Sequence, residues 1–477
     1  MIRQSTPLCI DMDGTLVRTD TLYECLISLI REKILYLIFI PFWLMRGKAY
    51  TKSRLAKHSS LKYEYLPYET NLIKWITQEH NSGRKIILAT GADEIIAKGV
   101  ANHLKIFHEV IGSNGVVNLS GLTKLRELEQ RYGKNNFDYV GNSRKDIEIW
   151  HNARLSIVVG TIKFINKIMR KEGISFDRIF IRNRFTAKDI FVTIRVNQWV
   201  KNLLLFVPLV TAHLINEIFL LKTLIVAFFA FGFTSSSIYI INDLMDLEYD
   251  RQHDRKQFRS LSSGTVPIYI GVMMVPLFMI SGLSLSYLIS SKYFTAVMLY
   301  ILLTLIYSLW LKKVVLADVI VLAILYTSRI IAGAIAINVV LSTWLMMFSI
   351  FIFLSLALSK RHSELYYLRG KDKIMAAGRG YKAIDLEQVS SFGSASGYIS
   401  ILIFALYINS AEVGKLYAHP TRLLLICPLL IYWISRIWLL SNRGEMPDDP
   451  VLFAVKDPVS YLVGGGIGLI LWIATVA

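Results

Sequence analysis

Long apolar stretches make up most of the chain from Asn202 to its end, and they limit the folds that this part can adopt. Several reach the roughly 20 residues that an α-helix needs to cross a bilayer. Within a bilayer only helices and closed barrels satisfy every backbone polar group, and unbroken apolar runs favour helices. We therefore predict a C-terminal all-α polytopic membrane domain. Its nine candidate transmembrane helices lie at residues 200–215, 220–241, 266–287, 293–311, 316–337, 343–359, 395–411, 422–440 and 459–476.

Lysine and arginine are concentrated in alternate loops between these spans, at residues 251–259, 312–313, 360–382 and 443–456. Cytoplasmic loops carry such an excess, so we place these loops and the N-terminal part on the cytoplasmic side of a bacterial inner membrane. Attraction to anionic lipid also accounts for the net charge of +18. We expect no nucleic-acid partner, because no basic stripe with interleaved aromatic residues stands apart from the spans.

Residues 1–160 have a different pattern, in which short β-rich runs alternate with helix-like segments. The expected strands lie at 7–10, 85–90, 109–111, 137–140 and 155–159, and helical spacing occurs at 93–103 and 122–132. This alternation predicts an N-terminal α/β, Rossmann-like domain with a parallel sheet covered by helices. Ligands of such sheets bind beyond the carboxyl ends of the strands.

Two further segments have two interpretations each. Residues 34–45 are apolar but too short to span a bilayer, and Pro41 interrupts them. We favour a buried helix of a cap inserted after the first strand over a segment that rests on lipid. Residues 161–198 are basic and amphipathic. We expect a linker along the cytoplasmic membrane face, with a plain solvated helix as the alternative, so that the membrane domain covers 199–477.

Asp11 and Asp13 follow the first predicted strand and are separated by one residue, in the sequence Asp-Met-Asp-Gly-Thr. Both carboxylates can then reach one loop crevice, where one attacks phosphorus and the other protonates the leaving oxygen. Together with Thr90 and the segment 141–146, this pair resembles the motifs of the haloacid dehalogenase superfamily over about residues 7–160.

The resemblance implies a phosphatase with a helical cap and assigns roles to particular residues. Asp11 is the nucleophile, Asp13 the acid and base, and Thr90 binds the phosphoryl group. Lys124 is our choice for the lysine of the third motif, although Lys98 competes. The Mg²⁺ ligands implied are Asp11, Asp13 and Asp146. Asn142 stands where family members commonly have Asp, so we expect weaker metal binding.

A second acidic cluster ends the apolar run that starts near Leu220. In a helix Asn242, Asp246 and Asp250 share one face, and Asp243 lies beside them. Carboxylates at a membrane are costly, and several on one face repel each other unless a cation is present. Mg²⁺ prefers a few carboxylates together with substrate phosphates. The cluster therefore predicts a diphosphate site at the membrane surface.

This cluster resembles the first motif of the UbiA prenyltransferase superfamily, and the resemblance extends from about Arg195 to the C-terminus. It implies that Asn242, Asp243, Asp246 and Asp250 hold Mg²⁺. The residues that it implies for binding substrate phosphates, or for orienting the donor, are Lys256, Arg259, Tyr307, Lys312, Arg329, Lys360 and Arg361. Taken singly, Lys312, Lys360 and Arg361 are better explained as markers of the cytoplasmic side than as ligands, and Tyr307 is also explained by the aromatic belt.

Asp318 distinguishes two branches of that family. Aromatic prenyltransferases have a second acid four residues later, where this chain has Leu322. Asp318, implied as a further metal ligand, followed by Arg329 and by the segment 360–365, resembles the phosphoribosyl branch instead. That branch transfers 5-phosphoribose from phosphoribosyl diphosphate to a polyprenyl phosphate such as decaprenyl phosphate.

We therefore expect a Mg²⁺-dependent transferase whose fused phosphatase removes the 5-phosphate from the lipid-linked ribose, for synthesis of cell-envelope glycan precursors. A tether would raise the effective concentration of one domain near the other's product. The principal alternative is a prenyltransferase that uses a prenyl diphosphate and an aromatic or other acceptor. A transporter with a regulatory domain and a non-catalytic scaffold are further alternatives. The lipid chain length and the oligomeric state are left open.

Overall fold

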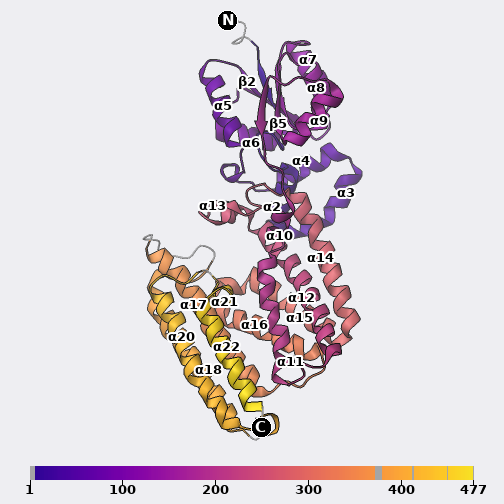
Figure 1. Ribbon diagram of the computed structural model, residues 1–477. Helices are drawn as coiled ribbons and strands as arrows, with labels where there is room; N and C mark the ends of the chain where they lie inside the picture. The colour runs from indigo at the N-terminus through magenta and orange to yellow at the C-terminus, as the bar shows by residue number, and fades with distance from the viewer. Residues whose placement is uncertain (1–5, 371–378, 411–412, 448, 476–477) are drawn as a thin grey trace. The chain divides into compact units, whose positions relative to one another are not determined.

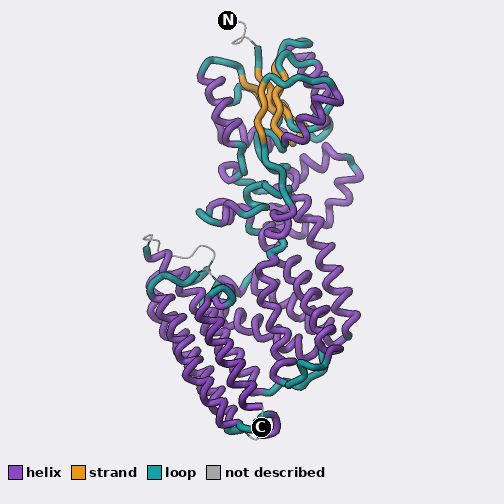
Figure 2. The backbone as a smooth tube through the Cα atoms, viewed as in Figure 1, coloured by secondary structure: helices purple, strands orange, loops and turns teal. Residues whose placement is uncertain are grey.

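The computed structural model describes residues 6–370, 379–410, 413–447 and 449–475 (Figure 1). Residues 371–378, part of one predicted cytoplasmic loop, lie outside this set. The chain forms two compact units. The α/β unit comprises Met1–Ile194 and Tyr239–Val275, and the helical unit comprises Arg195–Ile238 and Pro276–Ala477. Figure 2 shows the strands of the first unit and the helices of both.

The α/β unit contains one six-stranded parallel sheet of order β3-β2-β1-β4-β5-β6. Its strands are β1 (Leu8–Ile10), β2 (Ile86–Asp93), β3 (Glu109–Ser113), β4 (Asp138–Gly141), β5 (Ser156–Gly160) and β6 (Arg178–Ile181). The five predicted strands are all present. They are apolar because both faces of the sheet are covered, as is usual for parallel sheets.

Alternate side chains of the strands enter two separate cores, one on each face of the sheet. Leu8 and Ile10 pack with helices α5 (Thr70–Asn81) and α6 (Glu94–Leu104). Cys9 packs on the other face with α7 (Leu122–Tyr132), α8 (Ile147–His151) and α9 (Ile162–Glu172). Figure 1 shows these three helices together on one side of the strands. Successive side chains of a strand point to opposite faces of the sheet, and this alternation divides them between the two cores.

The sheet extends into the segment that the sequence analysis assigns to a linker. Thr161 caps the N-terminus of helix α9, because its side chain accepts a hydrogen bond from the backbone N–H of Phe164. The helix buries Ile165 and Ile168. Strand β6 follows and pairs with β5. The α/β unit therefore continues past residue 160, because α9 covers one face of the sheet and β6 forms its edge. Only α10 (Ala187–Thr193) and the residues beside it remain as a connection.

A helical insertion between β1 and β2 forms the predicted cap, but one of its segments differs from the prediction. The elements of the cap are α2 (Thr21–Lys33), η1 (Ile34–Phe39), α3 (Ile40–Met45), α4 (Lys48–His58) and η2 (Tyr63–Tyr65). We favoured a buried helix at residues 34–45, and this interpretation is wrong. Most of its apolar side chains are exposed and only Trp43 is buried. One side of this uncharged segment packs on the cap through Trp43, and no second layer of the α/β unit covers its other side.

Among the described residues, eight helices are long and apolar enough to cross a membrane. They are α12 (Ile218–Met245), α14 (Ile268–Ile289), α15 (Ser291–Leu309), α16 (Ala317–Ala336), α17 (Thr343–Arg369), the span Ala383–Ile408 with α18 (Leu386–Ile408), the span Pro420–Asn442 with η8 (Pro420–Leu425) and α20 (Ile426–Asn442), and α22 (Pro458–Thr475). The predicted first span is a bent pair, in which α10 meets η4 (Val196–Phe206) and α11 (Val207–Thr211) at 53°. Counting that pair makes nine.

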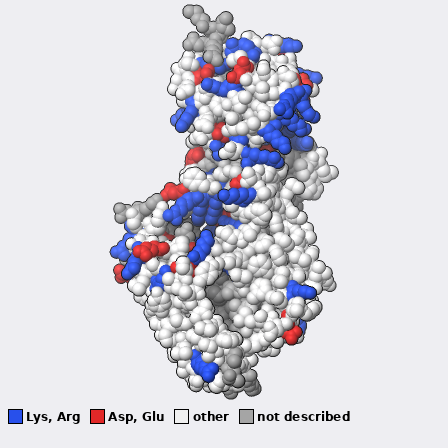
Figure 3. Space-filling view, in the orientation of Figure 1, with Lys and Arg blue, Asp and Glu red and all other residues white. Residues whose placement is uncertain are grey.

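Shorter elements connect these helices. They are α13 (Leu247–Gln252), η5 (Lys256–Phe258), η6 (Leu311–Lys313), η7 (Ala383–Asp385), α19 (Val413–Leu416) and α21 (Pro450–Ala454), with η3 (Arg144–Asp146) in the α/β unit. Helix α17 continues to Arg369, so Lys360 and Arg361 lie on a helix and not in the predicted loop after residue 359. In Figure 3 charged side chains are sparse along the sides of the helical unit.

Candidate active sites

The order of the sheet brings three sequence motifs together at one edge. Strand β1 lies between β2 and β4, so Asp11 just after β1, Thr90 within β2 and Gly141 at the end of β4 come from three neighbouring strands. Asp11 and Thr90 are buried. This is the crevice beyond the carboxyl ends of the strands where parallel sheets bind ligands.

A chain of buried hydrogen bonds begins at Asp11. Lys124 Nζ donates to Asp11 Oδ1 at 2.8 Å and to the Tyr139 hydroxyl at 3.0 Å. Tyr139 in turn donates to Asp146 Oδ1 at 2.9 Å. Lys98, the competing lysine, is exposed and pairs with Glu94 at 2.6 Å on its own helix. The structure therefore places Lys124, and not Lys98, against Asp11.

Burial shifts the pKa of both acids of the first motif upward. It raises the pKa of Asp11, an effect that the positive charge of Lys124 opposes. Burial, with the nearby charge of Asp20, raises the pKa of Asp13 to about 7. The Asp13 carboxylate accepts a hydrogen bond from the backbone N–H of Thr21 at 2.9 Å. A carboxyl group with a pKa near neutrality can serve as both acid and base.

The fourth motif, residues 141–146, borders the same crevice. Gly14 has φ of +71°, and a Cβ atom there would lie 2.2 Å from the side-chain nitrogen of Asn142. The turn after Asp13 therefore needs glycine, and Asn142 lies against it. Asp146 Oδ2 accepts hydrogen bonds from the backbone of Asn142 and from the backbone and hydroxyl of Ser143.

These contacts test whether the crevice fits Mg²⁺. Both oxygens of Asp146 already accept hydrogen bonds from its own loop and from Tyr139, so Asp146 fits the role of a loop-holding residue better than that of a ligand. Asp11 and Asp13 supply two carboxylates, which suffice for an ion that otherwise binds waters and substrate phosphate.

Lys52 is a cation that the sequence analysis missed. It lies on α4 of the cap and donates to the Gly91 carbonyl at 2.5 Å and to the Asn118 side chain at 3.0 Å. Burial lowers its pKa, whereas the charge of Asp13 raises it. Thr90 accepts a hydrogen bond from the backbone N–H of Ala92 at 3.1 Å, in the same turn. No motif marks Lys52, because only the folded cap brings it to the crevice.

The second acidic cluster lies where α12 ends. The helix stops at Met245 and α13 starts at Leu247, with Asp246 at the break. Backbone hydrogen bonds still run from Asp246 N to Asn242 O (2.9 Å) and from Asp250 N to Asp246 O (2.8 Å). The predicted spacing of four residues is thus kept through the break.

Arg259 bridges two of the acids. Its Nη1 atom donates to Asp243 Oδ1 at 3.0 Å and to Asp250 Oδ2 at 2.7 Å. Burial raises the pKa of Asp250, and Arg259 opposes this effect. The two carboxylates therefore converge on one positive charge. This arrangement fits a divalent cation shared by Asp243 and Asp250, with Arg259 released to a phosphate group.

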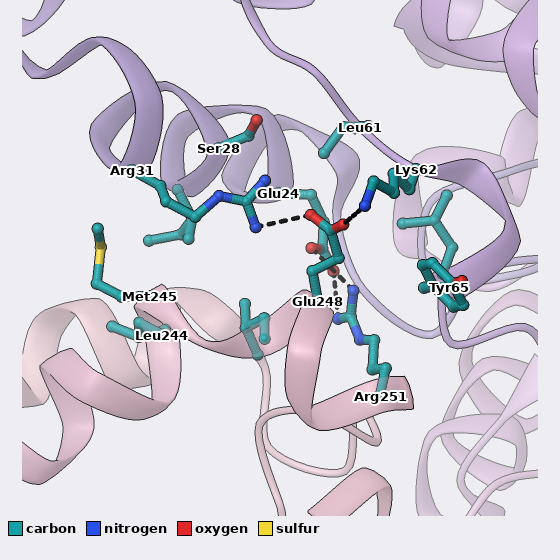
Figure 4. Close-up of a pocket in the computed structure, with 13 residues that line it drawn as sticks. Glu24, Ser28, Arg31, Leu61, Lys62, Tyr65, Leu244, Met245, Glu248 and Arg251 are labelled. Atoms are coloured by element: carbon teal, nitrogen blue, oxygen red, sulfur yellow. Dashed lines mark hydrogen bonds and ion pairs between the residues drawn. The ribbon is translucent and has the colours of Figure 1, made fainter. Parts of the chain in front are cut away.

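The loop around this cluster contacts the cap of the same unit (Figure 4). Arg251 pairs with the buried Glu24 at 2.6 Å, and Glu248 pairs with Arg31 and Lys62, each at 2.7 Å. These residues line a small pocket. Glu24 also accepts a hydrogen bond from Thr19 at 2.7 Å, a few residues after Asp13. The loops that carry the two acidic clusters are thus connected through Glu24.

In the helical unit, Asp318 is fully buried among cationic groups. Arg361 Nε lies 2.9 Å and Arg379 Nη1 3.3 Å from its Oδ2 atom, and the Tyr381 hydroxyl donates to Oδ1 at 2.7 Å. Two guanidinium groups contact one carboxylate oxygen of Asp318 and a neutral hydroxyl contacts the other, a setting that does not fit a metal ligand. Metal binding by Asp318 stays a prediction from the resemblance. Arg379 and Tyr381 were missed because they lie far from Asp318 in the sequence.

Arg329 occupies a buried aromatic cage. Its Nη2 donates to the Tyr300 hydroxyl at 2.8 Å, and its guanidinium lies 5.3 Å from the centre of the Phe231 ring. Nearby, Lys201 pairs with Asp449 at 2.5 Å, and both interact electrostatically with Lys360. Neither Lys201 nor Asp449 was predicted.

The remaining predicted residues lie at the ends of helices. Tyr307 is on α15 and forms a side-chain hydrogen bond with Arg379. Lys312 is half-buried on η6, and Lys256 is exposed on η5. In the part of the chain that the structure describes, no three His, Cys, Asp or Glu side chains form a ready metal cage. Mg²⁺ that relies on two carboxylates and substrate oxygens does not need one.

Comparison with known proteins identifies relatives of both parts. Residues 204–455 match the UbiA prenyltransferase family. An uncharacterized protein of Sinorhizobium fredii, y4nM, is 36% identical over 96% of this chain and 89% of its own length. Nodulation protein NoeC of Azorhizobium caulinodans is 32% identical over 60% of this chain and 95% of its own. Decaprenyl-phosphate phosphoribosyltransferase of Mycolicibacterium smegmatis is 33% identical over 61% and 92%, respectively.

Proposed function

This chain belongs to the UbiA prenyltransferase family, and from that premise we propose that it transfers 5-phosphoribose from phosphoribosyl diphosphate to a polyprenyl phosphate. The protein is an integral membrane transferase. The single observation that carries the proposal is the convergence of Asp243 and Asp250 on one cationic nitrogen. The similarity to decaprenyl-phosphate phosphoribosyltransferases supports the donor and the acceptor.

In the proposed reaction an oxygen of the lipid phosphate attacks C1 of the ribose, and the bond from C1 to the diphosphate oxygen breaks. The nucleophile is already an anion, so no general base is needed. Mg²⁺, when bound, neutralises charge on the departing diphosphate. Asp243 and Asp250 would hold the ion together with Asn242 and Asp246. Arg259 and Lys256 bind phosphate oxygens.

The α/β unit resembles haloacid dehalogenase phosphatases, and we propose that it removes the 5-phosphate from the lipid-linked product. Asp11 attacks phosphorus and forms an aspartyl phosphate, while Asp13 protonates the ribose oxygen that leaves. Asp13 then takes a proton from water, and this water releases phosphate. Lys124 holds the Asp11 carboxylate in place and adds positive charge for the phosphoryl group, and Lys52 adds a second cation at the cap. The dephosphorylated lipid would serve cell-envelope glycan synthesis.

An assay with purified protein in detergent tests the transfer. With phosphoribosyl diphosphate labelled in the ribose and with polyprenyl phosphate, label should enter the lipid fraction and be lost when Mg²⁺ is chelated. Asp250→Asn should lower the rate by about 100-fold or more, because it removes a charge that binds the ion. Asp254→Asn, an exposed acid of the same loop, is the matched control and should leave the rate near that of the wild type.

Asp11→Asn separates the two activities. This variant should still transfer label but accumulate the phosphorylated lipid, whereas the wild type forms the dephosphorylated one. If no label enters the lipid and the protein instead transfers a prenyl group from a prenyl diphosphate to an aromatic acid, the alternative function holds and the phosphoribosyl proposal is wrong.

A further inference from the structure

The segment Ile34–Met45 presents an apolar surface that no described part of the α/β unit covers. It has no charged residue. The side chains of Leu35, Phe42 and Met45 are 74%, 62% and 85% exposed. Contiguous exposed apolar side chains on a folded protein mark a surface that contacts a partner or a membrane. In Figure 3 the side of the cap that carries α3 is free of charged side chains.

The other face of the segment is fixed to the cap. Trp43 is buried, and its ring stacks on His58 with centroids 5.9 Å apart. Tyr36 and Ile40 pack on the same core. The exposed side chains are therefore held in place on a folded support. A segment fixed in this way presents one consistent face outward.

The start of the segment lies next to the end of a membrane span. Arg31, three residues before Ile34, pairs with Glu248, three residues after the last residue of α12. The last turns of α12, from Tyr239 onward, belong to the α/β unit itself. The exposed apolar surface is thus anchored close to the point where an apolar helix leaves the bilayer.

The charges that flank the segment favour a lipid surface over an apolar protein partner. Lys33 precedes it, and Arg46 and Lys48 follow it, all of them exposed. Cations at the border of an apolar patch match anionic lipid headgroups. Short amphipathic segments with this composition lie in the interface and do not cross the bilayer.

We propose that Ile34–Met45 is a membrane-interface anchor, which inserts its exposed apolar side chains into the headgroup region of the bilayer that holds the spans. The anchor fixes the cap, and with it Lys52 and the Asp11 crevice, at the lipid surface. This inference does not depend on the reaction that either unit performs. It predicts a lipid contact for a domain whose sheet is typical of water-soluble enzymes.

Depth-dependent fluorescence quenching tests the anchor in the full-length protein. In a Cys427→Ser background, cysteine is introduced at Phe42 or Met45, labelled with an environment-sensitive dye, and placed in nanodiscs that contain one protein each. Cys9 and Cys25 are buried and react slowly. The control position is Val116, which is 88% exposed on the α/β unit, outside the segment.

Lipids with a nitroxide on a shallow acyl carbon should quench the dye at residues 42 and 45 at least about threefold more than at residue 116. Anionic lipid should increase this difference. Phe42→Glu should bring quenching at residue 45 down to the control level, whereas Val116→Glu should not.

Equal quenching at all three positions would overturn the proposal. So would a dye at residue 42 that is shielded only when two copies share a disc, because the occupant would then be a second chain.

Discussion

The Lys124 ammonium group shows how a single residue acquires its role from burial. It is enclosed between Asp11 and Tyr139, so its charge is neutralised by a carboxylate that it also orients. Lys98 has the same chemistry but points to solvent. Buried charges are retained only when paired, and here the pairing selects one lysine of two.

Lys124→Ala should lower phosphate release from the lipid-linked product by about 100-fold or more, because it removes the cation beside the nucleophile. Lys98→Ala is the matched control and should retain nearly full activity. Single-turnover phosphate release on isolated labelled lipid measures both variants. Equal loss in the two variants, or none in either, would argue against the role of Lys124.

Arg259 illustrates a second effect at the residue scale. The sequence places it among the phosphate-binding cations, and the structure places it between two of the acids. These roles are compatible, since a guanidinium can neutralise two carboxylates before substrate binds and then donate to phosphate. Asp243 and Asp250 would repel each other without such a cation.

Among the elements, α2 and α13 are joined by charge and not by apolar packing alone. Glu24 is buried and Arg251 is partly buried, and they form two hydrogen bonds, at 2.6 and 3.1 Å. The loop after α13 also approaches the turn before α2 closely, because Gly264, with φ of +71°, lies against Arg18. A Cβ atom there would lie 2.9 Å from the Arg18 side chain, so the loop can approach only with glycine at this position.

Glu24→Gln should destabilise this part of the α/β unit by up to about 3 kcal/mol, because the partly buried charge of Arg251 loses its carboxylate and keeps only the Ser262 carbonyl as an acceptor. Thiol labelling of the adjacent Cys25, located by mass spectrometry, reports the opening of α2. Glu32→Gln, an exposed acid on the same helix, should change labelling little. The charge swap of Glu24→Arg with Arg251→Glu should restore part of the protection. Unchanged labelling in Glu24→Gln would show that the pair does not hold the helix.

At the scale of the whole molecule, the two units are interleaved along the chain. Tyr239–Val275 leaves the helical unit after Ile238 and completes the α/β unit. The acidic cluster of the transferase motif therefore belongs to the compact unit that also contains Asp11 and Asp13. The division at residues 160 and 199 that the sequence suggests does not describe this arrangement.

Separate fragments test the interleaving. Residues 1–194 and 195–477, expressed together, should copurify in detergent, because Glu248 and Arg251 contact the cap. Glu248→Lys in the second fragment should reduce copurification at least about fivefold, since two ion pairs become repulsive. Glu217→Lys, at an exposed acid of the helical unit, is the control. Copurification that is unaffected by Glu248→Lys, or absent for the wild type, would contradict the arrangement.

The sequence by itself determined the features that depend on local patterns. Apolar runs marked the spans, and alternation marked five of the six strands. The order of the motifs placed Asp11 and residues 141–146 at strand ends, because the carboxyl ends of parallel strands share an edge. The predicted strand end at Thr90 differs, since β2 continues to Asp93. The spacing of Asn242, Asp246 and Asp250 likewise follows from helix geometry.

Only the tertiary structure decided the features that depend on which distant residues meet. Strand β6 was recognised by its pairing with β5, since its own residues are mostly exposed. Four further features depend on which segments far apart in the chain meet. They are the exposure of Ile34–Met45, the exclusion of Lys98 in favour of Lys124, the position of Lys52 and the cations around Asp318. Composition reports what a segment can bury, whereas burial itself depends on whether another part of the fold covers it.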